Sequence, residues 1–384
     1  MAKIQGESKL SFWEATGIIV GHGVGAGILA VPALAARNSL REILMILCFC
    51  YLFNLVLHLI IAELSYNNGG AQFISCFDRE LFSGKFKKIF TWAAFALLGL
   101  SVLMNVSSFL TGAANVFNEW FGLNSTLGML LFYVLGAGVV FFGMKLVGIC
   151  EKYAVAAMVL VMALLFVVTV KGQTQPLPAA FGGGKNALAL LSVISFSLSA
   201  VMSTPQVVKG LEGDVKRIRL SIAAGLAVNA ALILLVTITT LLGVGAPSVT
   251  ENGALVDLAA RLGGWVSIVG YVFSLLALAT SFWANTLNLR DIVHEQTQLN
   301  EKLSWLCASL PCLVLAILSS VSFVKFTLFA SAIQVVTGIG IILAYHLSRR
   351  RVGASEIVGR FGAVPFQIFV FLCTMLATAG SFMG

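Results

Sequence analysis

The chain has 384 residues, of which 59% are hydrophobic and only 10% are charged, and its formal net charge is +8. Because ordinary soluble domains carry about 25% charged residues, this composition indicates a polytopic membrane protein without a separate soluble domain. The positive charge is expected to face anionic lipid, which argues against nucleic acid as a partner. The seven cysteines show no CxxC spacing, which favours free buried thiols over a metal or disulfide role.

The first apolar segment, from Phe12 to Ala36, contains the sequence GHGVGAGILAVP at residues 21–32. A membrane span needs about 20 apolar residues, but glycine and proline weaken the interior of a helix. Broken backbone at membrane depth is tolerated only where protein or a water-filled cavity satisfies it. The segment therefore predicts a break that binds a carboxylate and a small cation, with close GxxxG helix packing as the alternative. The four glycines are Gly21, Gly23, Gly25 and Gly27.

His22 lies inside this predicted break. Histidine can carry a transported proton because its ordinary pKa is about 6.5. We favour the other interpretation, in which a neutral His22 forms a hydrogen bond with unwound backbone.

Apolar stretches separated by charged or turn residues predict eleven membrane spans. The alternating loops hold 18 lysines and arginines on the side of the N-terminus and 6 on the other side. Since cytoplasmic loops are enriched in these residues, we expect the N-terminus in the cytoplasm and the C-terminus outside the plasma (cell inner) membrane. The limits of the spans are 11–36, 40–66, 87–117, 124–143, 150–171, 186–208, 218–243, 254–289, 303–320, 323–347 and 362–382.

Polar residues recur inside three later spans. The third span carries Asn105 on a stripe of serines, for which hydrogen bonding between helices is the favoured explanation. The sixth span has the run FSLSAVMSTP, which ends at Pro205 as the small-residue run of the first span ends at Pro32. Interrupted helices at matching places in two halves of a chain indicate a transporter site between inverted repeats.

The eighth span places Thr280 beside Ser281. Two hydroxyl oxygens at one place can bind a hard cation such as sodium, although each hydroxyl can instead bond to its own helix one turn back. No buried carboxylate is evident in the sequence. The four histidines lack metal-ligand spacing, and no phosphate-binding loop or hydrolase motif occurs, which argues against a metalloenzyme or ATP-driven transport.

These motifs are similar to those of one superfamily. The run GHGVGAGILAVP resembles the first helix of the amino acid–polyamine–organocation superfamily, above all the GxxxGAGxLxxP form of the aromatic and hydroxy amino acid permeases. The sequence AELSYNNGGAQFISCF at 62–77 resembles the end of its second helix, and eleven spans match the amino acid/auxin permease branch. The resemblance implies an all-α LeuT-type fold with broken helices 1 and 6, built from repeats 11–171 and 186–347 plus an additional helix 362–382.

The resemblance also implies a substrate site. In the LeuT-type fold the substrate carboxylate meets free amides in broken helix 1, which here would be those of Ala26 and Gly27. The segment Phe196–Ser199 is similar to the part of helix 6 that takes the amino group, and Met202 would wall the side-chain pocket one turn further on. The implied substrate-binding residues are Gly25, Ala26, Gly27, Asn105, Phe196, Ser197, Ser199 and Met202.

The sodium site of that fold is similar to pieces of this sequence. It combines two carbonyls from helix 1 with a carbonyl and an adjacent Thr–Ser pair from helix 8, and the matching residues here are Gly21, Val24, Ala277, Thr280 and Ser281. A proton-coupled branch has a lysine in the middle of helix 5, where this chain has Lys152 and Lys171 only at the ends of the span. The aromatic permeases are generally proton-coupled, and they tend to carry a hydroxyl residue where His22 stands.

We therefore expect a symporter of neutral amino acids, aromatic or other large ones among them, driven by sodium through alternating access. The alternative is proton coupling through His22. A channel would need a continuous polar stripe, and a membrane enzyme would need paired titratable groups at one depth; the sequence shows neither. No cofactor besides the coupling ion is expected, the partners are an amino acid and membrane lipid, and the sequence specifies no oligomeric state.

Overall fold

The computed structural model describes residues 9–25, 27–250, 254–319 and 323–381, and every regular element in them is helical. Three are short 3-10 helices, η1 (Val201–Ser203), η2 (Ala246–Ser248) and η3 (Gly359–Gly362). The α-helices are α1 (Phe12–Val24), α2 (Gly27–Ala35), α3 (Leu40–Asn67), α4 (Phe73–Glu80), α5 (Lys87–Phe121), α6 (Ser125–Phe141), α7 (Met144–Lys171), α8 (Gly183–Leu198), α9 (Thr204–Gly210), α10 (Val215–Val244), α11 (Ala254–Leu262), α12 (Trp265–Thr297), α13 (Glu301–Leu318), α14 (Phe323–Val352) and α15 (Val364–Gly380).

Seven of the described helices are long and apolar enough to cross a membrane, if α8 and α9 are taken as one. The pair α1 and α2, inclined by 57° to each other, gives an eighth span if the two helices are taken as one broken crossing. Two shorter apolar helices, α6 and α15, coincide with further predicted spans, and the 30-residue α14 with another. The all-helical membrane fold is confirmed, whereas the count of eleven crossings stays a prediction.

The prediction of a single span over 254–289 is wrong. Two helices, α11 and α12, occupy this stretch, and they meet at Gly263 and Gly264. The backbone of Gly263 has a φ of +106°, which glycine adopts without the steric penalty that other residues pay. The short helix α4 between α3 and α5 was likewise not expected.

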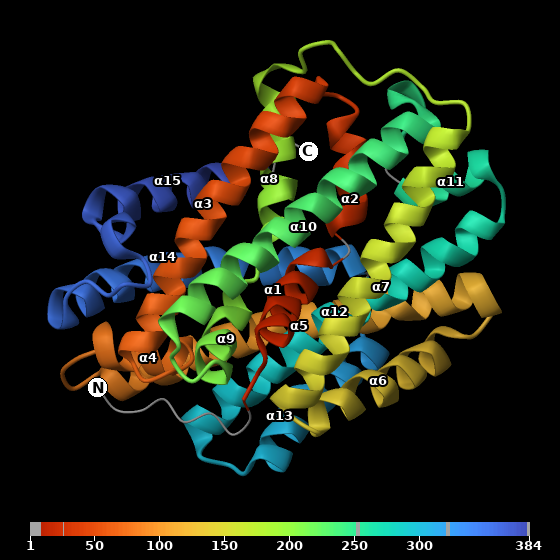
Figure 1. Ribbon diagram of the computed structural model, residues 1–384. Coiled ribbons are helices and arrows are strands. Elements are labelled where there is room, and N and C mark those ends of the chain that lie inside the picture. Colours follow the sequence, from red (N-terminus) through yellow and green to blue (C-terminus); the bar gives the residue numbers. More distant parts are fainter. Residues whose placement is uncertain (1–8, 26, 251–253, 320–322, 382–384) are drawn as a thin grey trace.

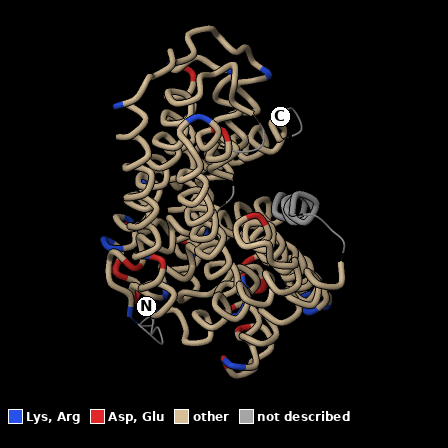
Figure 2. Tube along the Cα trace, turned by 90° about the vertical axis from the view of Figure 1, so that its right-hand side faces the viewer, with Lys and Arg blue, Asp and Glu red and all other residues tan. Residues whose placement is uncertain are grey.

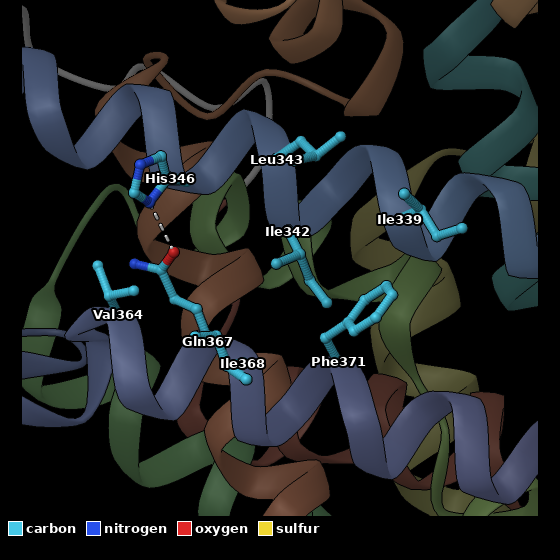
Figure 3. Close-up of a pocket in the computed structure, with 8 residues that line it drawn as sticks. All are labelled: Ile339, Ile342, Leu343, His346, Val364, Gln367, Ile368 and Phe371. Atoms are coloured by element: carbon cyan, nitrogen blue, oxygen red, sulfur yellow. Dashed lines mark hydrogen bonds between the residues drawn. The ribbon is translucent and has the colours of Figure 1, made fainter.

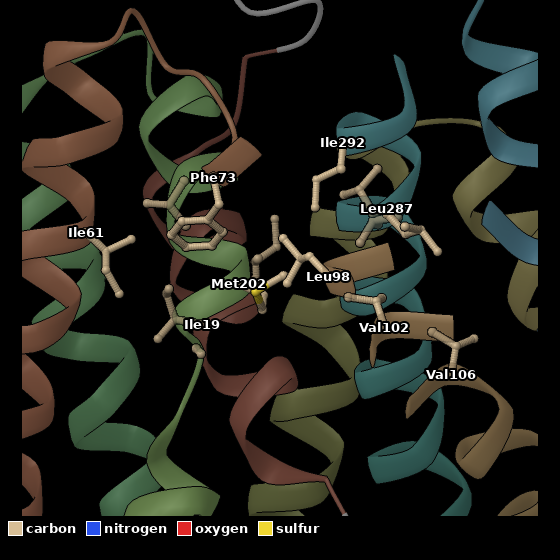
Figure 4. Close-up of a cluster of buried hydrophobic side chains, with 14 of the residues drawn as sticks. Ile19, Ile61, Phe73, Leu98, Val102, Val106, Met202, Leu287 and Ile292 are labelled. Atoms are coloured by element: carbon tan, nitrogen blue, oxygen red, sulfur yellow. The ribbon is translucent and has the colours of Figure 1, made fainter. Parts of the chain in front are cut away.

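Helix α1 of the broken span lies near the centre of the bundle (Figure 1). It packs against α7, α10 and α12. The long helix α5 packs against α6, α12, α13 and α14. A cluster of buried apolar side chains fills the region beside α1, with Ile19, Ile61, Phe73, Leu98 and Met202 among its members (Figure 4).

Glycines let α1 approach its neighbours closely. A Cβ atom at Gly17 would lie 2.9 Å from the backbone nitrogen of Lys152 in α7, and one at Gly23 would overlap the Asn229 amide of α10. The glycines of the first span therefore agree with both interpretations, close helix packing and a helix break, because they allow close contacts and the break follows them.

Charged residues gather toward one end of the molecule (Figure 2). Lys145 lies 2.6 Å from Glu14, and Arg349 lies 3.1 Å from the fully buried Glu63. Arg351 lies 2.5 Å from Glu80, the last residue of α4. Burial alone would raise the pKa of Glu80, but hydrogen bonds from the Arg351 guanidinium and the Asn68 amide hold that pKa below its ordinary value. These ion pairs tie α1 to α7, α3 to α14 and α4 to α14.

Candidate substrate and cation site

The break in the first span brings the start of α2 against the end of α8. Helix α1 ends at Val24 and α2 begins at Gly27, while Ala26 lies outside the described residues. A Cβ atom at Gly27 would lie 2.8 Å from Ser197 Oγ and 3.1 Å from Phe196 Cδ1. The structure thus brings together three residues of the predicted substrate site, Gly27, Phe196 and Ser197, and Gly25 directly precedes them.

Two of these residues have unusual surroundings for a membrane span. Ser197 is fully buried, yet its hydroxyl has no hydrogen-bond partner among the described residues. The Phe196 side chain is 45% exposed although it stands in the middle of an apolar span. A buried hydroxyl without a partner costs free energy, so the end of α8 offers both an unsatisfied polar group and an aromatic surface.

The sixth span is also broken. Helix α8 ends at Leu198, Ser199 is extended at φ −77° and ψ 113°, and the chain turns into η1 at Val201. The Ala200 N–H donates to His58 Nε2 at 2.9 Å, and His58 Nδ1 lies 2.7 Å from the Asn54 carbonyl. A ring nitrogen that accepts leaves the other to donate, so His58 is neutral in this arrangement. The predicted break is therefore present, and a side chain from α3 satisfies its backbone.

Other amides hold the same break. The Asn229 side chain of α10 donates to the Ser197 carbonyl at 2.8 Å, and the Asn288 side chain of α12 donates to the Met202 carbonyl. No sequence motif marks His58 or Asn229 for this role. The only signal in the chain was a polar residue within a long apolar helix, which usually faces the interior of the bundle.

His22 joins the two broken spans. Its Nδ1 lies 2.8 Å from the hydroxyl of the buried Ser203, at the end of η1. We expected His22 to bond to unwound backbone, but its partner is a side-chain hydroxyl. The histidine that bonds to unwound backbone is His58. The role of His22 as a proton site remains a prediction.

Asn105 and Met202 have other described contacts. The Asn105 amide donates to Asn285 Oδ1 at 3.3 Å, which links α5 to α12. The Met202 side chain is buried in the apolar cluster with Ile19 and Leu98 (Figure 4). Neither contact joins these residues to the Gly27 group, so their predicted roles toward the substrate side chain stay predictions.

The predicted cation ligands meet where α1 packs against α12. Ser281 Oγ donates to the Gly21 carbonyl at 3.3 Å, and it would lie 3.0 Å from a Cβ atom at Gly25. Thr280 Oγ1 donates to the Ala277 carbonyl at 3.0 Å, and Thr280 Cβ would lie 2.9 Å from a Cβ atom at Gly21. Gly21, Ala277, Thr280 and Ser281 therefore share one junction, and the buried Val24 ends α1 one turn further on.

Glu151 is the residue that the sequence interpretation missed. It is fully buried in α7, and its Oε2 occupies the space that a Cβ atom at Gly21 would need. The expectation that the membrane interior holds no buried carboxylate is therefore wrong. The predicted span began at residue 150, which put Glu151 at its end, whereas α7 begins at Met144 and carries Glu151 two turns inward.

A separate pocket of about 280 Å³ lies between α14 and α15 (Figure 3). Its only polar lining comes from His346 and Gln367, which are 3.0 Å apart and bond to each other. None of the predicted site residues lines it. The apolar lining residues are Ile339, Ile342, Leu343, Val364, Ile368 and Phe371.

Two helical spans interrupted at 25–26 and 199–200 lie close together, an arrangement typical of transporters that bind substrate at helix breaks. The chain belongs to the tryptophan/tyrosine permease family, whose model matches residues 8–376. No curated protein sequence matches the chain.

Two solved transporters have a similar fold. The crystal structure of MhsT in complex with L-phenylalanine has a TM-score of 0.69 at 14% identity, and the match covers 98% of this chain and all of MhsT. The nucleobase-cation-symport-1 family transporter Mhp1, closed around bromovinylhydantoin, has a TM-score of 0.64 at 14% identity, with 100% of this chain and 92% of Mhp1 covered. At this identity the similarity establishes the fold alone.

Proposed function

We propose that this protein is a secondary active symporter that imports aromatic amino acids, with tryptophan and tyrosine as the first candidates. Its family supports amino-acid transport, and the similar transporter MhsT is described with L-phenylalanine. The observation that carries the proposal is the meeting of the α2 start with the unpartnered hydroxyl of Ser197 and the exposed ring of Phe196.

The site chemistry fits a zwitterion with an aromatic side chain. Backbone N–H groups at the start of a helix bind a carboxylate without any arginine, and those of Ala26 and Gly27 are the proposed donors. Ser197 and Ser199 would accept hydrogen bonds from the amino group. The Phe196 ring would stack on the aromatic side chain, since such ring pairs are worth about 1 kcal/mol beyond the burial of their area, with Asn105 and Met202 bounding the pocket.

The coupling cation is proposed to bind at the junction of α1, α7 and α12. Sodium is one candidate, with the oxygens of Gly21, Val24, Ala277, Thr280 and Ser281 as ligands. The proton is the second candidate, and the specific observation in its favour is the buried carboxylate of Glu151 against Gly21. The cell inner membrane, with a cytoplasmic N-terminus and an external C-terminus, is the proposed location.

Uptake by the purified protein in liposomes tests this function. A panel of labelled amino acids would be offered under an imposed sodium gradient, an imposed pH gradient, both, or neither. We expect tryptophan or tyrosine to accumulate above the external concentration under one gradient and not in its absence. Counterflow of a labelled aromatic amino acid against an unlabelled internal pool requires no gradient and so tests substrate recognition alone. Failure of every aromatic amino acid in counterflow would contradict the proposal.

A further inference from the structure

The pocket between α14 and α15 is a groove formed by one face of each helix. Each helix lines it with four residues that span seven positions and lie on the same side of that helix. Seven positions rise about 10 Å along a helix, so the groove has about that length. Figure 3 shows His346 and Val364 at one end and Ile339 and Phe371 at the other. The two helices therefore run in opposite directions along the groove.

The groove is apolar and opens away from the helix bundle. The side chains of Leu343, Val364 and Ile368 are 54%, 48% and 54% exposed. The polar groups in its lining are already engaged, because His346 Nδ1 bonds to Gln367 Oε1 at 3.0 Å and the Gln367 amide donates to a backbone carbonyl. Apolar cavities stay free of water and accept apolar ligands. On the outer surface of a membrane bundle, the apolar ligand at hand is the acyl chain of a lipid.

The end of the groove at His346 leads to two exposed arginines. Arg350 follows His346 by one turn on the same face of α14, and Arg360 lies in η3, four residues before the start of α15. Among the described residues neither guanidinium has a carboxylate partner, and that of Arg360 lies 5.2 Å from the centre of the Phe361 ring. Glu356, the one acid between α14 and η3, is exposed and forms no ion pair with either arginine.

The two neighbouring arginines have other roles. Arg349 lies 3.1 Å from Glu63 and Arg351 lies 2.5 Å from Glu80, so both hold α14 against other helices. Arg350 and Arg360 thus remain for a ligand, and a guanidinium presents a fork of N–H donors that matches a phosphate group. Basic pockets between helices on the cytoplasmic side, where this end of α14 is predicted to lie, suit anionic lipid head groups.

We propose that the groove binds one anionic phospholipid, with an acyl chain along the apolar lining and the phosphate between Arg350 and Arg360. The inference rests on the membrane fold and does not depend on the transported substrate. The two parts of the site act on different parts of the ligand. The trimethylammonium group of phosphatidylcholine would meet two guanidinium groups, so the site should distinguish lipids by their net charge even when their acyl chains are the same.

Photochemical labelling of the protein in liposomes tests the inference. Phosphatidylglycerol and phosphatidylcholine with the same diazirine-bearing acyl chain would each be added in trace amounts. We expect the phosphatidylglycerol probe to label the groove segments 339–346 and 364–371 at least fivefold more than the phosphatidylcholine probe. The two probes should label the exposed face of α6, with Leu127, Leu131 and Val134, within twofold of each other.

The charged part of the site is tested by the double substitution Arg350→Gln and Arg360→Gln. We expect the preference for phosphatidylglycerol in the groove segments to fall to less than twofold. The matched control is Lys216→Gln with Arg219→Gln, since these are two exposed basic residues at the start of α10 on the same predicted side of the membrane. This control removes the same charge and should keep the full preference.

The apolar part of the site is tested by Ile368→Trp, which places a larger side chain in the groove lining. Labelling of segment 339–346 by both probes should fall at least threefold. Leu372→Trp is the matched control, because Leu372 lies one turn further along α15, is 58% exposed and does not line the groove. Labelling of the same segment should be unchanged in this control.

Three results with the wild-type protein would overturn the inference. Equal labelling of the groove by the two probes would show ordinary lipid contact only. Loss of the preference on addition of excess inorganic phosphate would show a site for a free anion and not for a lipid. Protection of the groove from both probes would show that another protein surface, such as a second copy of the chain, covers it. These comparisons need no variant, so they decide the question even if a substituted protein fails to fold.

Discussion

At the scale of single residues, Gly27 has the most restrictive surroundings in the proposed substrate site. A side chain there would have to displace both Ser197 Oγ and the Phe196 ring, which lie 2.8 Å and 3.1 Å from the position of its Cβ atom. Gly27→Leu should therefore abolish tryptophan binding in a scintillation proximity assay while the protein is still inserted in the membrane. Gly184→Leu is the control, because a Cβ atom there meets nothing within 4 Å. Normal affinity in Gly27→Leu would remove the substrate from this place.

His58 should matter for the stability of the sixth span. Its Nε2 accepts the Ala200 N–H at 2.9 Å, and both residues are fully buried in the helix bundle. His58→Ala leaves that N–H unsatisfied, which costs about 1–3 kcal/mol, whereas the side-chain oxygen in His58→Gln can still accept it. We expect thermal unfolding in detergent to occur at a lower temperature for His58→Ala than for His58→Gln. Equal unfolding temperatures would show that the hydrogen bond does not stabilise the break.

The sequence shows local patterns of residues, but it does not show which side chains from distant segments become buried against one another. Gly21, Gly27, Thr280 and Ser281 were predicted because a glycine run or a paired hydroxyl is visible locally. Glu151 was missed, since its burial depends on where α7 begins and on the absence of a side chain at a glycine 130 positions earlier. No local pattern carries that information.

At the scale of elements, Leu10, two residues before α1, ties the start of that helix to α7 and α9. The Leu10 N–H donates to the Gly210 carbonyl at 2.8 Å, and the buried Leu10 side chain lies against both Gly148 and Gly210. This contact seals α1 against α7 and α9. If alternating access requires α1 to separate from α7, the seal is the contact that must open on this side.

Gly148→Leu should weaken this seal. A Cβ atom at Gly148 would lie 2.9 Å from the Leu10 side chain and 3.1 Å from Glu14 Cβ, so leucine forces α1 away from α7. We expect a cysteine at the buried position Thr16 to react with an impermeant thiol reagent at least several-fold faster in the Gly148→Leu background. Gly138→Leu on α6 is the control, since nothing lies within 4 Å of its Cβ position. Equal reaction rates in the two backgrounds would contradict this role of the α1–α7 contact.

Both helix breaks were predicted from runs of small residues that precede a proline, although Pro32 and Pro205 themselves lie within α2 and α9, beyond the breaks. The split between α11 and α12 was missed although Gly263 and Gly264 mark it. The residues on both sides are largely apolar, so the whole stretch was taken as one span. The partners of the breaks were not predictable. Asn229 and Asn288 come from α10 and α12, and only the packing of those helices against the breaks brings the amides to the carbonyls of Ser197 and Met202.

At the scale of the whole molecule, the charge distribution decides which way the protein faces. Eighteen of the 24 lysines and arginines fall on the side of the N-terminus in the predicted arrangement of spans. Arg217 and Arg261 are suitable positions to test this orientation, because most of α10 separates them along the chain. That helix has 30 residues, and at 1.5 Å per residue it runs about 45 Å, enough to cross the hydrocarbon core. A single labelled residue at each end therefore reports on opposite faces of the membrane.

We expect Arg261→Cys, in a background without the seven native cysteines, to react with an impermeant maleimide in intact cells. Arg217→Cys and Arg350→Cys should react only after the membrane is opened. All three arginines are exposed, so failure to react reports the side of the membrane and not burial. Each variant must first retain uptake of an aromatic amino acid, since four of the native cysteines are buried and their replacement can disturb packing. External labelling at position 217 would show that the predicted orientation is inverted. The contact formed by Leu10 would then lie on the outer and not on the cytoplasmic side.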